Sequence, residues 1–182
     1  MIIDKGCDLD YAANKCASVG FLNSGQTCIR NDYVLIESSL ANAFITKLKS
    51  HMENIYKTKD TLGKVINQFH YDRICKLMED HQGTVVIGNP NVHEDKNLTP
   101  AVILQPSKDS PIMKEEIFGP LLPVYTYKNI DEAIEFVNSL DKPLAVYYFG
   151  KNSFSNKNLM RVKEETTAGA FLVNEVAMHF LN

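Results

Sequence analysis

Metal-binding patterns are missing from this sequence. Its four cysteines, Cys7, Cys16, Cys28 and Cys75, form no C-x-x-C pair and have no histidine at zinc-finger spacing. The five histidines are scattered, and no H-E-x-x-H motif occurs. We therefore predict no structural or catalytic metal site. Reduced thiols fit a reducing compartment, so we expect an intracellular protein, most simply of the cytoplasm, with the mitochondrion as an alternative.

Long apolar runs and an excess of one charge are also missing. The 19 Lys and Arg residues nearly balance the 22 Asp and Glu residues, and neither half of the chain is strongly basic. Nucleic-acid binding needs clustered basic side chains to neutralise phosphates, so we expect no nucleic-acid partner. The longest apolar stretches, such as residues 144–149, are too short to cross a bilayer, and the first six residues do not resemble a secretory signal.

The composition is that of an ordinary globular protein. Hydrophobic residues make up 45% of the 182 positions and charged residues 23%. A chain of this length buries about 70% of the surface of its unfolded form, so it needs no disulfide or metal to complete a core. We expect one domain over residues 1–182.

Helical and extended patterns alternate along the chain. Apolar residues recur at helical spacing in residues 9–21, 40–55, 68–80, 130–142 and 154–166. Short β-branched or aromatic runs predict strands at residues 33–36, 84–88, 101–104, 121–127, 144–150 and 169–174. This alternation predicts an α/β fold with three layers, in which helices cover both faces of a mostly parallel sheet.

Several local signals refine this prediction. Ser38 or Ser39 is expected to cap the second helix, and Asn129 with Glu132 forms a capping-box pattern. Pro123 predicts that its strand lies at an edge or begins irregularly. The strand at residues 84–88 is expected to be buried, and the polar residues 89–97 to form a loop.

The segment Phe21-Leu22-Asn23-Ser24-Gly25-Gln26-Thr27-Cys28 places a thiol just after a glycine-containing bend. A cysteine on such a bend can face a cleft, where backbone N–H groups favour its thiolate and an oxyanion beside it. The alternative for an isolated cysteine is a buried structural role, because free cysteine is among the most buried residue types. We assign that role to the other three cysteines.

Two motifs together separate Cys28 from the other thiols. Residues 23–28, N-S-G-Q-T-C, resemble the catalytic cysteine motif of the aldehyde dehydrogenase superfamily, and residues 115–120, E-E-I-F-G-P, resemble a second motif of that superfamily. The resemblance covers essentially the whole chain. The cysteine motif, followed by Asp32-Tyr33-Val34-Leu35, and the stretch Met178-His179-Phe180 are most similar to the class 3 branch, which handles fatty and aromatic aldehydes.

The resemblance implies a chemistry with named residues. The thiolate of Cys28 would attack an aldehyde, and the adduct would pass hydride to NAD or NADP and leave a thioester. Glu116 would hydrogen-bond the ribose beside the nicotinamide, and Phe118 would pack near it. Without the resemblance, Glu115 and Glu116 are a solvated acidic pair and Phe118 is a core residue.

The resemblance also implies that parts of the enzyme lie outside this chain. The family's NAD(P)-binding domain, its general base and its oxyanion-hole Asn are expected before residue 1, and a glycine-rich segment after residue 182; no G-x-G-x-x-G loop is present. We therefore expect the chain alone to bind no cofactor and to be inactive. It would need the missing domain or a protein partner, in an oligomer or a larger complex.

Two positions depart from the family pattern. Arg30 adds a charge near the thiol, and we expect it to point into solvent. The run Thr167-Ala168-Gly169-Ala170 lacks one glycine of a usual Gly-Gly pair, which would strain the chain if that position needed a positive φ. Two other functions stay open: a non-catalytic structural or interaction subunit that keeps the fold, and a small redox or acyl-carrying thiol protein.

Overall fold

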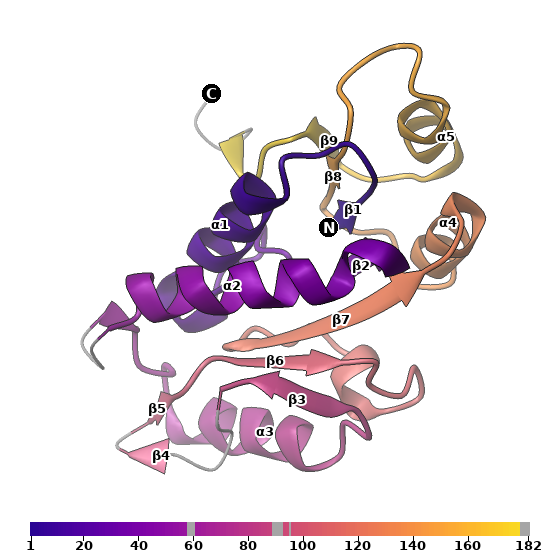
Figure 1. The fold of residues 1–182 in the computed structure, drawn as a ribbon. Helices are drawn as coiled ribbons and strands as arrows, with labels where there is room; N and C mark the ends of the chain where they lie inside the picture. Colours follow the sequence, from indigo (N-terminus) through magenta and orange to yellow (C-terminus); the bar gives the residue numbers. More distant parts are fainter. Residues whose placement is uncertain (58–60, 89–92, 95, 179–182) are drawn as a thin grey trace.

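A seven-stranded sheet organises the chain in the computed structural model, which describes residues 1–182 except 58–60, 89–92, 95 and 179–182 (Figure 1). The strand order is β3-β6-β7-β2-β1-β8-β9, and all neighbours are parallel except β3 and β6. The strands are β1 (Ile2–Ile3), β2 (Val34–Glu37), β3 (Thr84–Ile87), β6 (Ala101–Leu104), β7 (Leu121–Tyr127), β8 (Ala145–Phe149) and β9 (Ala170–Val173).

Helices cover both faces of this sheet. They are α1 (Leu9–Gly20), α2 (Ala41–Ile55), α3 (Gln68–Glu79), α4 (Ile130–Asn138) and α5 (Lys157–Glu165). The helices α1 and α2 pack on one face, and α3, α4 and α5 on the other (Figure 1). This arrangement confirms the predicted three-layer α/β fold.

The alternation of side chains along each strand divides the core between the two faces. In β2, Val34 and Ile36 pack with α1 and α2, whereas Leu35 packs with α4 and α5. Because successive strand residues point to opposite faces, a strand buried on both sides reads as a continuous apolar run. This explains the V-L-I sequence of β2.

Asparagine and aspartate side chains begin most of the helices. Asp8 accepts a hydrogen bond from the Tyr11 N–H, and Asn67 and Asn156 cap α3 and α5 in the same way. The predicted capping box of α4 is present, but Glu132 reaches back to the N–H of Lys128 rather than to that of Asn129.

The predictions for the cap of α2, for β3 and for residues 89–97 were wrong. Glu37, not Ser38 or Ser39, caps the turn before α2 by accepting from the Ser39 N–H. Of β3 only Ile87 is buried, because this strand is the antiparallel edge of the sheet. Within residues 89–97, β4 (His93–Glu94) pairs with β5 (Asn97–Leu98) instead of forming a plain loop; residues 89–92 and 95 lie outside the described part.

Pro123 was predicted at an edge, yet β7 is an inner strand between β6 and β2. The Val124 carbonyl bonds toward β6 through the Gln105 N–H, so alternation turns the backbone of Pro123 toward β2. The paired register with β2 begins only at Val34 opposite Val124. Pro123 therefore lacks an N–H where no neighbouring strand needs one.

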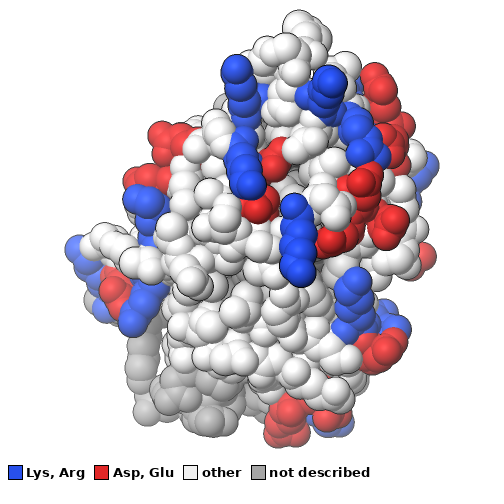
Figure 2. All heavy atoms as spheres, turned by 45° about the vertical axis from the view of Figure 1, so that its right-hand side comes forward, with Lys and Arg blue, Asp and Glu red and all other residues white. Residues whose placement is uncertain are grey.

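The first strand was not predicted, because two residues carry no periodicity. Ile2 and Ile3 are buried between β2 and β8, which pair with them on either side. On the side shown in Figure 2, acidic and basic side chains are interspersed. Arg161 pairs with both Asp131 and Glu165, each at 2.6 Å. Among the described residues, no helix is both long and apolar enough to cross a membrane.

Candidate active site

A cleft of about 570 Å³ lies at the amino ends of β2 and β8. Its walls come from the segment before β2, the segment before β7 and the segment before β8. Cys28 and Glu116 both line it. The structure thus brings the two motif segments, almost ninety positions apart in the sequence, to one cavity.

The cysteine loop, residues 21–30, turns sharply after α1. Asn23, Ser24 and Gly25 have φ angles of 52°, 57° and 72°, which place three consecutive residues in the left-handed region. A turn follows, closed by the Arg30 N–H to the Thr27 carbonyl at 3.1 Å. The thiol of Cys28 is exposed on this turn.

Side chains hold the cysteine loop from two directions. The Gln26 amide donates to the Lys64 carbonyl and accepts from the Ile66 N–H, both at 3.0 Å. On the other side the Tyr147 hydroxyl donates to the Ile29 carbonyl at 2.6 Å. Burial raises the pKa of Tyr147 to about 12, so the hydroxyl keeps its proton as a donor at neutral pH.

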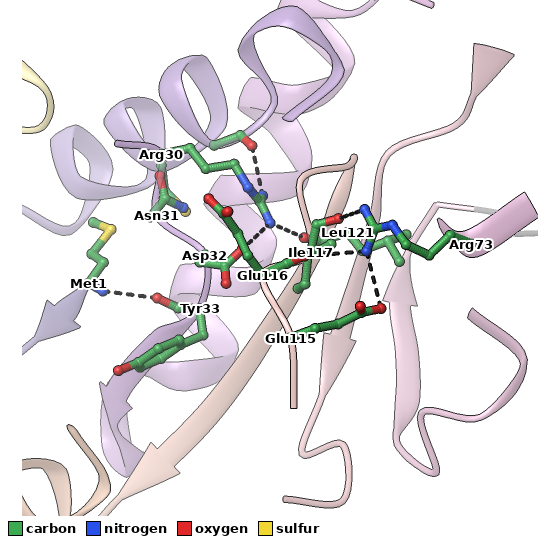
Figure 3. Close-up of polar contacts among 12 residues, drawn as sticks. Met1, Arg30, Asn31, Asp32, Tyr33, Arg73, Glu115, Glu116, Ile117 and Leu121 are labelled. Atoms are coloured by element: carbon green, nitrogen blue, oxygen red, sulfur yellow. Dashed lines mark hydrogen bonds and ion pairs between the residues drawn. The ribbon is translucent and has the colours of Figure 1, made fainter. Parts of the chain in front are cut away.

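Arg30 does not point into solvent, contrary to the prediction. Its guanidinium is buried and donates to the carbonyls of Gly20 and Leu121 at 3.0 and 3.1 Å, and it pairs with Asp32 at 2.7 Å (Figure 3). Leu121 opens β7 at a point where β2 has not yet begun to pair. Arg30 therefore satisfies a strand carbonyl that β2 leaves free, and its role here is structural.

The cysteine loop touches the loop of Glu116, residues 114–120, through two glycines. A Cβ on Gly25 would lie 2.1 Å from the Gly119 carbonyl oxygen, so only glycine allows this approach. Phe118 has a φ of 44° and remains 38% exposed, so it is not a core residue. Glu115 points toward Arg73, whereas Glu116 points away from it (Figure 3).

The remaining cysteines differ from Cys28 in their environment. Cys16 is buried, and burial raises the pKa of its thiol to about 12. Cys7 and Cys75 are half-buried, which also raises the pKa of each thiol. The predicted buried role is therefore right for Cys16 and too strong for the other two.

Sequence reasoning missed the residues that support the site. Arg73, Gln26 and Tyr147 each bond to backbone groups that lie far away in the sequence, and no spacing rule connects them. Only the position of Gln26 inside the cysteine motif could have drawn attention to it. The condition for strain near Gly169 is not met, because φ is positive at neither Ala168 nor Ala170.

The comparison with protein families decides the identity of the fold. A model described as the aldehyde dehydrogenase family matches residues 1–181. The chain belongs to the aldehyde dehydrogenase family. Mouse aldehyde dehydrogenase family 3 member A2 is 38% identical over an alignment of 182 positions, which covers 98% of this chain and 37% of that protein.

Other relatives give the same picture. The mouse aldehyde dehydrogenase described as dimeric and NADP-preferring is 35% identical over 97% of this chain and 39% of its own length. The substrate-bound Staphylococcus aureus AldH structure superposes with a TM-score of 0.91 at 32% identity, covering 100% of this chain and 40% of that one. The chain thus spans about two fifths of the proteins it resembles.

Two further predictions concern metal ligands and the stretch 178–180. No group of three or more potential metal ligands occurs within the part of the chain that the structure describes. Of the stretch 178–180, Met178 is 47% exposed, while His179 and Phe180 lie outside the described residues.

Proposed function

We propose that residues 1–182 are the catalytic part of an NAD(P)-dependent aldehyde dehydrogenase, with Cys28 as nucleophile and Glu116 and Phe118 as cofactor contacts. The observation that carries this proposal is the meeting of the two loops. The Gly25–Gly119 contact puts the exposed thiol and the Glu116 carboxylate on one cleft. A structural subunit would have no need of that arrangement.

The covalent steps follow from the chemistry of a thiolate. The sulfur of Cys28 forms a bond to the aldehyde carbon, and the carbonyl electron pair moves to oxygen. Loss of hydride from that carbon leaves a thioester on Cys28. Water then adds to the thioester, so that the carboxylic acid leaves and the thiol is restored. The sum is aldehyde, NAD(P)⁺ and water giving acid, NAD(P)H and a proton.

The residues present fit one end of a dinucleotide. An exposed carboxylate such as Glu116 can accept hydrogen bonds from ribose hydroxyls, and the exposed ring of Phe118 offers a flat apolar surface. When bound, the cofactor supplies the hydride acceptor. The chain has no glycine-rich phosphate loop, so we expect the rest of the dinucleotide to be held by the portion that the longer relatives possess.

The contacts that hold the cysteine loop support this function. Tyr147, Gln26 and the Gly25 contact fix the turn that carries Cys28 from three sides, so that the thiol is presented without rearrangement. We expect the general base and the cofactor domain to come from outside residues 1–182. The isolated chain should therefore produce no NAD(P)H from aldehydes.

A chimera tests the proposal directly. Residues 1–182 would replace the matching 182-residue segment of mouse aldehyde dehydrogenase family 3 member A2. We expect NAD(P)H formation from a long-chain or an aromatic aldehyde, and Cys28→Ala should lower it by at least about 10⁴-fold. Cys75→Ala, at a cysteine that does not line the cleft, is the matched control and should keep the activity.

Either arm can contradict the proposal. A folded chimera without turnover would favour the non-catalytic subunit. Turnover that survives Cys28→Ala would mean that the donor segment or another thiol does the chemistry.

A further inference from the structure

Arg73 connects α3 to the loop that carries Glu116. Its Nη2 donates to the Ile117 carbonyl at 2.6 Å, and its Nη1 donates to the Glu116 carbonyl at 3.3 Å and to the Glu115 carboxylate at 3.2 Å (Figure 3). The guanidinium thus straddles two successive peptide groups. A planar fork reaches these groups from two nitrogens in a fixed geometry, whereas lysine would have to reach them from one nitrogen on a flexible stem.

The contacts to the carbonyls matter more than the ion pair. The Glu115 carboxyl is 47% exposed, so its pairing with Arg73 is screened by water and contributes little. The Arg73 side chain is only 19% exposed, and its Nε has no hydrogen-bond partner within the described chain. The guanidinium is therefore aligned to the two carbonyls at the cost of one unsatisfied N–H.

The residue next to Arg73 holds the other end of the same loop. A Cβ on Gly119 would lie 2.7 Å from Cδ1 of Ile74, so Gly119 packs directly on α3. Between these two fixed points Phe118 takes its φ of 44° and keeps its ring exposed. Because a left-handed φ is unfavourable for phenylalanine, the flanking contacts must maintain it.

The segment that leads into α3 also holds the cysteine loop. Gln26 bonds to the backbone of Lys64 and Ile66, which directly precede α3. Residues 64–74 therefore contact both loops of the cleft. Together with the Gly25–Gly119 contact, this segment holds the loops of Cys28 and Glu116 relative to each other.

We propose that Arg73 is a positioning residue for the cofactor: it fixes the peptide groups of Glu116 and Ile117, so that the Glu116 carboxylate faces the cleft and the Phe118 ring stays presented. This inference rests on the proposed function, because it assigns the cleft to NAD(P). Arg73 itself does not touch the reacting atoms.

Two readouts separate this inference from the proposed function. In the active chimera, Arg73→Met should raise the KM for NAD(P) about tenfold while the rate of Cys28 acylation by an activated ester stays unchanged. Arg73→Lys keeps the charge without the fork and should give an intermediate KM. Glu115→Gln removes only the exposed ion pair and should leave KM within about twofold.

The isolated chain supplies the second readout, because it contains no tryptophan. Phe118→Trp introduces a single reporter, whose fluorescence anisotropy should fall when Arg73→Met or Arg73→Lys is added and not when Glu115→Gln is added. This arm works even if the chimera shows no turnover and the proposed function fails. Unchanged anisotropy in folded Arg73→Lys, or a loosened loop with unchanged KM, would overturn the positioning role.

Discussion

The two edges of the sheet differ in how their polar groups are satisfied. At the carboxyl edge, buried Asp4 accepts from the Tyr148 hydroxyl at 2.7 Å and from the Asn158 amide at 2.9 Å. There the Asn174 side chain also bonds to both the N–H and the carbonyl of Gly150. These contacts satisfy the polar groups at the carboxyl edge, where Asp4 and Asn158 also line a second cavity of about 460 Å³.

The amino edge leaves polar atoms unsatisfied. Ser24 Oγ, Asn31 Oδ1 and Arg73 Nε are buried and have no hydrogen-bond partner among the described residues. Left-handed φ angles occur here at Asn23, Ser24 and Phe118, and at the carboxyl edge at Gln105 and Asn174, so only the unsatisfied groups separate the two edges. Buried unsatisfied polar groups are features of functional sites.

This difference bears on a rule for α/β proteins. Ligands usually bind at the carboxyl ends of parallel strands, where the sheet topology opens a crevice. Here the cleft with Cys28 and Glu116 lies at the amino ends. Under the proposed function, the remaining part of the cofactor site would therefore adjoin the amino edge.

The largest effect is expected at Gly25. An added methyl group would lie 2.1 Å from the Gly119 carbonyl oxygen at a φ of 72°, so Gly25→Ala should lower the free energy of unfolding by about 3 kcal/mol and slow Cys28 alkylation. Urea denaturation and site-resolved alkylation measure the two effects.

Two glycines serve as controls for Gly25. Gly6 has a similar φ of 82°, but a Cβ there would meet Lys151 only at an ordinary van der Waals distance of 3.5 Å, so Gly6→Ala should cost only about 1 kcal/mol. A Cβ added at Gly88, away from the cleft, would lie 2.0 Å from the Pro100 carbonyl oxygen. Gly88→Ala should therefore destabilise the protein without slowing alkylation. Equal alkylation rates in Gly25→Ala and Gly88→Ala would break the comparison.

A smaller effect on stability is expected at the carboxyl edge. Asp4→Ala leaves the Tyr148 hydroxyl and the Asn158 amide without their acceptor and should cost about 2 kcal/mol of stability. Asp4→Asn keeps one acceptor oxygen and should cost about half as much. Both variants should alkylate at Cys28 as fast as the unmodified chain, and a slower rate would show that the edges are coupled.

The smallest effect is expected at Ser24. Its hydroxyl is buried without a partner in the described chain, so Ser24→Ala removes an unsatisfied group. We expect a change in unfolding free energy between zero and a gain of about 1 kcal/mol, measured by urea denaturation. A loss of more than about 1 kcal/mol would contradict the view that the amino edge is incompletely satisfied.

Periodicity and motifs predicted the architecture and the two loops of the cleft. The five helices and six of the strands follow from local apolar spacing, and Cys28 and Glu116 from short motifs. Prediction failed where distant contacts decide the outcome. Arg30 looked like a solvated charge because its two carbonyl partners, at Gly20 and Leu121, lie on other segments.

Pro123 and the strand β1 teach the same lesson. A proline argues against an inner strand only if its missing N–H has a partner strand, and β2 begins one residue too late to be that partner. Ile2–Ile3 becomes a strand only because β2 and β8 flank it. Neither fact is present in the local sequence.

The central claim is that the amino edge presents Cys28 as the nucleophile. The most direct test exposes the isolated chain to an activated ester and measures acylation of each cysteine by peptide mass spectrometry. We predict that Cys28 is acylated first, that Cys7 and Cys75 follow more slowly because burial raises their pKa, and that Cys16 reacts only on unfolding. Acylation of Cys28 no faster than that of Cys7 or Cys75 would contradict the account.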